Sequence, residues 1–89
     1  MNKLEEARKK INQIDAEMLQ LFVQRMEAVK EVAAYKKENH LPVFDEDRET
    51  ILLQRNLSML QEEILSPYYK MFFEGVLKSS KEYQKEIIK

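Results

Sequence analysis

The N-terminal part of the chain constrains the fold most, because residues 3–38 contain neither glycine nor proline. Apolar residues recur there at steps of three and four, the spacing that puts side chains on one face of an α-helix. This apolar stripe consists of Leu4, Ala7, Ile11, Ile14, Met18, Leu21, Phe22, Ala28, Val29, Val32 and Tyr35. The pattern predicts one amphipathic helix over about residues 3–38, with a length of about 50 Å.

The rest of the chain predicts two shorter helices. Pro42 disfavours helix at the residue before it and lacks an N–H, so residues 39–45 are expected to form a loop. A second helix over about residues 46–62 begins with Asp45 as its N-cap. A third helix covers about residues 67–87.

Ser66 is the expected N-cap of this third helix, and Pro67 suits its first position. Strand signals such as alternating β-branched residues and Asn-Gly turns are missing from the sequence. We therefore expect an all-α fold in which residues 1–89 form a single domain of one long and two shorter helices.

The length of the first helix favours a dimer. A compact domain of 89 residues would have a radius of gyration of only about 12 Å. Two shorter helices cannot readily cover the apolar stripe of a 50 Å helix. We expect a homodimer in which the long helices pack together.

Composition excludes several classes of function. The 15 basic and 16 acidic residues leave a net charge of −1, whereas a general nucleic-acid binder would carry a basic excess. No apolar run approaches the ~20 residues of a membrane span and no signal peptide is visible, so a cytoplasmic protein is expected. With no cysteine and one histidine, neither thiolate chemistry nor a metal site is expected.

Residues at alternating steps of four and three along the apolar face of the long helix form its seam. Four of these residues are charged rather than apolar: Arg8, Asp15, Arg25 and Lys36. Such residues can lie at the edge of the seam and extend to water, and for Asp15 we expect that or a structural salt bridge. Arg25 has apolar neighbours on both sides. Arg25 therefore either extends its charge to water at the edge of the seam, has a buried ion-pair partner or binds an anionic ligand, because an unpaired buried charge is very costly.

The use of arginine favours a ligand that carries carboxylates. The chain has eleven lysines but four arginines, and arginine grips carboxylates through its planar, bidentate fork. Arg8, Arg25 and Arg48 lie at candidate positions, and Ser80 and Gln84 interrupt the apolar side of the third helix. These residues predict a site for a small polyanion such as a dicarboxylate. Phosphate is less favoured because there is no glycine-rich loop.

Spacing along the helix limits which residues can share one ligand. Arg25 and Lys36 are eleven residues apart, or ~16 Å, which long side chains can bridge. Arg8 is seventeen residues from Arg25, or ~25 Å. If Arg8 contributes to the same site, we expect it to come from the partner chain of an antiparallel pair.

These features resemble the all-helical chorismate mutases, the AroQ class, over essentially the whole chain. The resemblance rests on "ARKKINQIDAEMLQLFVQRMEAVKEVAAYKKE", on the turn "LPVFDEDRE" and on the late "SSKEYQ". The family pattern is an early Arg followed by I-x-x-I/L-D, a central E/Q-R and a Lys near the end of the first helix. A P-V-x-D-x-x-R-E turn and a final Ser-x-x-x-Gln follow. Each motif alone is unspecific, but the ordered set is highly specific.

The resemblance implies an enzyme that converts chorismate to prephenate by an intramolecular 3,3-rearrangement, on the route to phenylalanine and tyrosine. It implies no cofactor and no metal. It also implies an intertwined homodimer with two equivalent sites.

The family's roles map onto matching residues of this sequence. By resemblance, Arg25 would bind one substrate carboxylate with Ser80 assisting, and Arg8 of the other protomer would bind the second carboxylate. Lys36 would donate to the ether oxygen as its bond breaks, and Gln84 would donate from the opposite side.

The acidic turn supplies the remaining roles implied by the resemblance. Glu49 would accept from the ring hydroxyl with Asp45 close by, and Arg48 would line the site and help to hold its charge network. Some family members carry glutamate in place of Gln84, and a glutamate must be protonated to donate. Because an amide needs no proton, we expect activity that does not require acid pH.

Other functions remain compatible with the sequence. A related lyase on the same scaffold removes pyruvate from isochorismate, and the motif residues separate it poorly from the mutase. A non-catalytic helical module for dimerisation or regulation is a further alternative, although such a module has no reason to keep Lys36 or Gln84 in its core. The family is often fused to other shikimate-pathway domains, and the sequence leaves open whether more chain follows Lys89.

Overall fold

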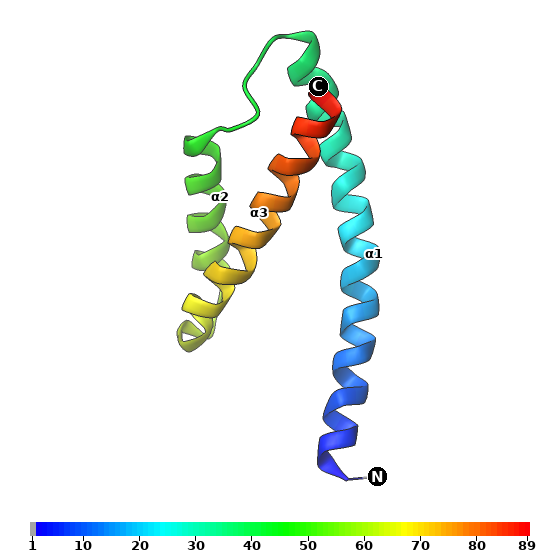
Figure 1. Cartoon of the computed structure of the whole chain (residues 1–89). Helices are drawn as coiled ribbons and strands as arrows, with labels where there is room; N and C mark the ends of the chain where they lie inside the picture. Colours follow the sequence, from blue (N-terminus) through cyan, green and yellow to red (C-terminus); the bar gives the residue numbers. More distant parts are fainter. Residues whose placement is uncertain (1) are drawn as a thin grey trace.

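The computed structural model describes residues 2–89, which form three α-helices and one short 3-10 helix (Figure 1). The elements are α1 (Lys3–Glu38), α2 (Glu46–Met59), η1 (Glu63–Leu65) and α3 (Ser66–Ile88). This described part contains no strand, so the expected all-α architecture is confirmed. None of its helices combines the length and the apolar character needed to cross a membrane.

A tight turn reverses the chain at the end of α1. Asn39 caps the helix, and His40 adopts a left-handed conformation with φ 55°. The Leu41 N–H then donates to the Lys36 carbonyl at 2.9 Å. This is the Schellman arrangement, which satisfies a carbonyl of the last helical turn and directs the loop back toward the end of α1.

The starts and ends of the shorter helices follow local backbone geometry. Asp45 is the N-cap of α2, as expected, and its Oδ1 accepts from the Arg48 N–H at 3.1 Å. The second helix ends at Met59, rather than at about residue 62, because Leu60 is extended (φ −74°, ψ 119°). Ser66 is not an N-cap, which corrects our expectation. Its own backbone is helical (φ −53°, ψ −47°) because η1 runs directly into α3.

The third helix joins the other two. It packs against both α1 and α2, and Figure 1 shows it crossing from the end of α2 to the C-terminal half of α1. The N-terminal half of α1 extends beyond this contact. The molecule is consequently elongated, with extents of 55 × 25 × 15 Å and a radius of gyration of 16.3 Å rather than the ~12 Å of a compact domain.

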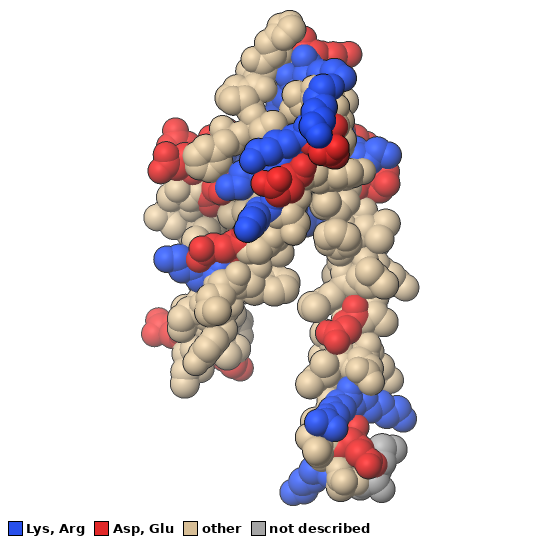
Figure 2. All heavy atoms as spheres, in the orientation of Figure 1, with Lys and Arg blue, Asp and Glu red and all other residues tan. Residues whose placement is uncertain are grey.

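The core of the single chain is small. Among the described residues, the buried apolar side chains are Val29, Ala33 and Phe73, which lie where α1 and α3 meet. Most of the predicted stripe of α1 is exposed, including Leu4, Ile11, Ile14, Met18, Leu21, Phe22, Val32 and Tyr35. In Figure 2 the visible face of α1 below its junction with α3 carries mostly uncharged side chains until near the N-terminus. One chain alone therefore leaves the stripe largely uncovered.

Candidate active site

A small cavity of about 160 Å³ lies between the C-terminal halves of α1 and α3, the loop and the start of α2. Seven of the eight residues predicted for the site line it, namely Arg25, Lys36, Asp45, Arg48, Glu49, Ser80 and Gln84. The other lining residues are Val29, Val32, Val43, Leu52, Leu77 and Lys81. Arg8 is not among them.

Helical spacing explains why the polar residues of α1 and α3 converge. Arg25 and Lys36 are eleven residues apart, close to three full turns, so they share one face of α1. Ser80 and Gln84 are one turn apart on α3. Both are buried, at 6% and 7% exposure, although they are polar. The packing of α3 on α1 thus places two neutral hydrogen-bonding groups against two cations.

Lys36 is held by two acceptors from different parts of the chain. Its Nζ donates to the Gln84 Oε1 at 2.9 Å and to the Val43 carbonyl at 2.8 Å. An ammonium group has three protons, so one remains for a ligand. Because an ammonium can only donate, it turns the oxygen of Gln84 toward itself and leaves the amide NH₂ as a donor. The pair can therefore offer two donors, one from each helix.

Arg25 is oriented by a side chain of α3. Its guanidinium donates to the Ser80 Oγ, and the Ser80 hydroxyl donates to the Val76 carbonyl at 2.9 Å. The single hydroxyl proton of Ser80 is therefore used in the hydrogen bond to the backbone, and the Ser80 oxygen accepts a hydrogen bond from Arg25. No carboxylate of residues 2–89 lies within 4.0 Å of Arg25, so the structural ion pair considered from the sequence is not formed within this chain.

Burial disfavours the charge of Arg25. Loss of solvent lowers the pKa of its guanidinium from the ordinary value, and the nearby Tyr69 raises the pKa by a smaller amount. The lowered pKa means that the fold disfavours the charged form. An arginine stays charged at working pH, so this residue is a cation without a carboxylate partner among residues 2–89. Such a group is suited to binding an anion.

The first turn of α2 brings acidic and basic groups to the mouth of the cavity. Asp45 and Arg48 are exposed there, and the Asp45 side chain is already engaged in capping the helix. Glu49 is half-buried and pairs with Lys81 of α3, with 3.3 Å between Nζ and Oε2. The N-terminal position of these carboxylates also suits the positive end of the α2 dipole.

The charge of the cavity favours a dianionic ligand. Its cations are Arg25, Lys36, Arg48 and Lys81, and its carboxylates are Asp45 and Glu49, for a net charge of +2. No group of three or more potential metal-ligating side chains occurs within the described residues. The arrangement can bind two carboxylates and donate hydrogen bonds to an atom that gains negative charge.

Sequence reasoning missed two groups of the cavity. Lys81 was not singled out, although Leu77, Ser80, Lys81 and Gln84 follow the i, i+3, i+4, i+7 spacing of one helix face. That spacing is the signal that would have found it. The carbonyl of Val43 holds Lys36, but a backbone acceptor in a loop leaves no signal in the sequence.

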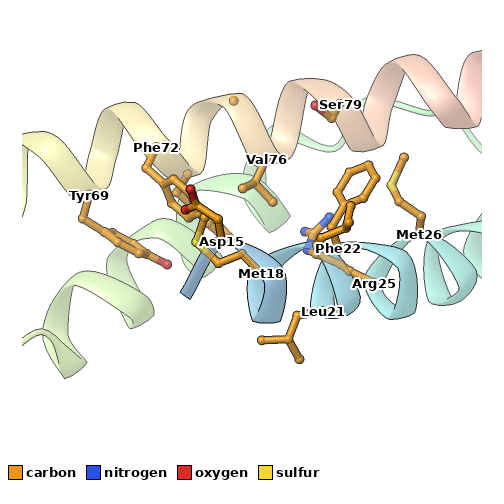
Figure 3. A pocket seen from close by; sticks show the side chains of 13 residues that line it. Asp15, Met18, Leu21, Phe22, Arg25, Met26, Tyr69, Phe72, Val76 and Ser79 are labelled. Carbon is orange, nitrogen blue, oxygen red and sulfur yellow. The ribbon is translucent and has the colours of Figure 1, made fainter. Parts of the chain in front are cut away.

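A wider groove of about 690 Å³ opens beside the cavity, between α1 and α3. Figure 3 shows Phe22 and Arg25 rising from α1 toward α3, while Tyr69 and Val76 project from α3 toward α1. Arg25 lines both spaces. The groove is mostly apolar and open, and no helix within residues 2–89 covers it.

Two charged residues of the α1 seam lie away from the cavity. Asp15 lines the groove, and within the described residues it forms no salt bridge, so the structural ion pair expected as one alternative is not made in a single chain. Arg8 is exposed on the first turns of α1, ~25 Å along the helix from Arg25. The structure of one chain does not bring Arg8 to the other site residues.

Comparison with known proteins agrees with the motifs of the sequence. The family model described as chorismate mutase type II matches residues 7–85. A protein of Methanocaldococcus jannaschii named chorismate mutase is 29% identical over 89 aligned residues, which cover 99% of this chain and 90% of that protein. No solved structure matches the chain significantly.

A second relative is a much longer protein, of which the similar segment is a small part. The T-protein of Haemophilus influenzae is 37% identical over 54 residues, which are 61% of this chain but only 14% of T-protein. The family match covers most of the chain, and the resemblance seen in the sequence is confirmed. The chain therefore belongs to the type II chorismate mutases, a family of isomerases.

Proposed function

We propose that the protein converts chorismate to prephenate by a cofactor-free, intramolecular 3,3-rearrangement in the pathway to phenylalanine and tyrosine. The observation that carries this proposal is the Lys36–Gln84 hydrogen bond in a cavity beside Arg25, a cation without a carboxylate partner among residues 2–89. Membership of the chorismate mutase family supports the choice of substrate. The net charge of +2 suits a substrate with two carboxylates.

Binding in this proposal depends on arginine. Arg25 binds one carboxylate of chorismate through the guanidinium N–H groups that Ser80 does not use. Ser80 assists by holding Arg25 in place. The second carboxylate is bound by Arg8 of the partner subunit. Together the two contacts clamp the compact conformer from which the rearrangement proceeds, and which free chorismate populates poorly.

Catalysis in this proposal is electrostatic. The transition state is more polarised than the substrate, because negative charge grows on the ether oxygen as its bond breaks. The free proton of Lys36 and the NH₂ group of Gln84 donate to that oxygen from opposite sides. These donors are held in place before the reaction, so they stabilise the transition state more than the substrate. One such donor typically contributes about 10²–10³ in rate.

The start of α2, from Asp45 to Glu49, completes the proposed site. Glu49 accepts a hydrogen bond from the ring hydroxyl of chorismate, and Asp45 supports the start of the helix that carries Glu49. Arg48 lines the mouth of the cavity and adds to its positive charge. No residue forms a covalent bond with the substrate in this scheme.

We infer that the active form is an intertwined homodimer. The exposed stripe of α1, the elongated shape of one chain and the distance of Arg8 from the cavity all support this assembly. A second, antiparallel copy would cover the apolar groove and bring its own Arg8 to the site. The full chain, residues 1–89, is one such domain in this proposal.

The direct test is to mix the purified chain with chorismate, without added metal, and to follow substrate loss and prephenate formation. Lys36→Ala should lower kcat/KM by at least about 100-fold. Lys37→Ala is the matched control, because Lys37 is the next lysine of α1 and is exposed outside the cavity. Its kcat/KM should stay within about twofold of the unaltered chain.

The same assay distinguishes the alternative functions. Isochorismate is supplied in a parallel reaction, and release of pyruvate there without turnover of chorismate would identify a lyase. No turnover of either compound by a folded dimer would identify a non-catalytic module. Either result would overturn the proposed mutase activity.

A further inference from the structure

We propose that Lys81 is a positioning residue for Glu49, and that it neutralises this carboxylate so that the cavity can accept a dianion. The inference rests on the proposed mutase function, because it concerns how one of the proposed substrate contacts is held. Lys81 is not one of the motif residues that the family pattern described above contains. The inference comes from the contacts of its ammonium group.

Lys81 contacts both oxygens of the Glu49 carboxylate. Its Nζ lies 3.3 Å from Oε2 and 3.4 Å from Oε1. A cation nearly equidistant from both oxygens fixes the direction of the carboxylate and leaves lone pairs on each oxygen for another donor. In the proposed site that other donor is the ring hydroxyl of chorismate. Lys81 therefore orients the Glu49 carboxylate and leaves some of the acceptor sites of that carboxylate free.

A third group restrains Lys81 itself. The Nζ lies 4.6 Å from the centroid of the Phe44 ring, a cation–π contact. Phe44 belongs to the loop, Glu49 to α2 and Lys81 to α3. One ammonium thus connects three segments at the rim of the cavity, next to the cap residue Asp45.

This ion pair differs from the other ion pairs of α3. Lys85–Glu82 and Lys89–Glu86 are i,i+3 pairs on the helix surface, with side chains at least 60% exposed. The Lys81–Glu49 pair joins two helices, and its side chains are 28% and 22% exposed. Both members line the cavity. A pair that is partly shielded from water is less screened than a surface pair, so its charges act on a bound ligand.

The charge of Glu49 explains why a partner is needed. A lone carboxylate in this cavity would repel both carboxylates of the substrate. With Lys81 present the lining carries a net charge of +2, and without it the net charge would be +1. The repulsion acts on the substrate and on the transition state alike, because both are dianions. Loss of Lys81 should therefore raise KM more than it lowers kcat.

The test is a double-mutant cycle on the full chain with chorismate. We expect Lys81→Met to raise KM about tenfold while kcat changes less than about threefold. Lys81→Arg, which keeps the charge, should restore KM to within about threefold of the unaltered value. In a Glu49→Gln background there is no carboxylate to orient or neutralise, and only the loss of one cation from the lining remains, so Lys81→Met should raise KM by no more than about threefold.

Lys85→Met is the matched control, because it removes a paired lysine one turn further along the same helix and outside the cavity. Urea unfolding of every variant shows whether the fold persists. An equal effect of Lys81→Met in both backgrounds would overturn the inference, as would an effect no larger than that of Lys85→Met. A lack of turnover by the unaltered chain would instead overturn the proposed function, and this inference with it.

Discussion

The ammonium of Lys36 and the amide oxygen of Gln84 lie 2.9 Å apart, although 48 residues separate them in the sequence. Lys36 comes from the last turns of α1, and Gln84 comes from the C-terminal half of α3. The contact orders the amide, because a cation that can only donate must face the amide oxygen. The NH₂ group is then available to a substrate at any pH, whereas a carboxyl group would donate only when protonated.

This geometry predicts the pH dependence of the reaction. The rate of the unaltered chain should be nearly constant between about pH 6 and pH 8, because the Gln84 amide donates a hydrogen bond without having to bind a proton first. In Gln84→Glu, the introduced carboxyl group donates only below its pKa. The rate of that variant should fall by about tenfold per pH unit above this pKa. The measurement is kcat against chorismate in a series of buffers of equal ionic strength.

Gln84→Met serves as the control for this series. It removes the donor at similar side-chain size, so it should be slow at every pH and show no slope. A profile of the unaltered chain that collapses between pH 6 and pH 8, or a Gln84→Glu profile parallel to it, would contradict the role of Gln84 as a donor.

Arg25 should contribute to activity at the expense of stability. Burial lowers its pKa, which shows that the folded state disfavours the charge, and no carboxylate of the described chain offsets this cost. Because arginine stays protonated at ordinary pH, the cost is present over the whole working range. We expect Arg25→Met to lower kcat/KM by about 10³-fold and to raise the free energy of unfolding.

Urea unfolding followed by circular dichroism measures the stability of Arg25→Met. Arg55→Met is a suitable control, since it removes an exposed arginine of α2 outside the cavity. A clear loss of stability in Arg25→Met alone would show that Arg25 is a structural residue rather than one kept for a ligand.

The proposed contribution of Arg8 from the partner subunit can be tested by mixing variants. Arg8→Ala and Arg25→Ala should each be nearly inactive. In a heterodimer of the two, one site would carry both changes and the other site would carry neither. Random mixing should therefore restore about a quarter of the unaltered activity.

Subunit exchange must be verified for this experiment, for example by mass spectrometry of differently labelled chains. If Arg8 acted within its own chain, each site of the heterodimer would carry one change. Verified heterodimers without recovered activity would then exclude the arrangement in trans.

The turn after α1 should matter for catalysis because it carries an acceptor for Lys36. His40 has φ 55°, a conformation that β-branched residues adopt only with strain. His40→Val should lower the free energy of unfolding by about 1–2 kcal/mol. It should also lower kcat severalfold, because the Val43 carbonyl would no longer hold Lys36 firmly.

His40→Asn is the matched control for the turn, since asparagine tolerates the left-handed region. It should keep both stability and kcat near the unaltered values. Equal losses in the two variants would mean that the imidazole ring itself, rather than the backbone conformation, is required.

The helices could be predicted from sequence because their signals are local. The stripe from Leu4 to Tyr35 and the stop at Pro42 located α1, and Asp45 located the start of α2. The expected cap at Ser66 was wrong, because a preceding 3-10 turn already placed that residue in helical conformation. A short helix of three residues has too few periodic positions to be recognised from a pattern.

By itself, the sequence determined the type and approximate length of the helices and the polar residues on their apolar faces, because helical periodicity acts over neighbouring residues. Only the tertiary structure decided which of those residues meet. The contact of Glu49 with Lys81 and that of Lys36 with the Val43 carbonyl depend on how α1, α2 and α3 pack. Such contacts follow from the packing of distant segments and from backbone groups, which every residue type carries alike.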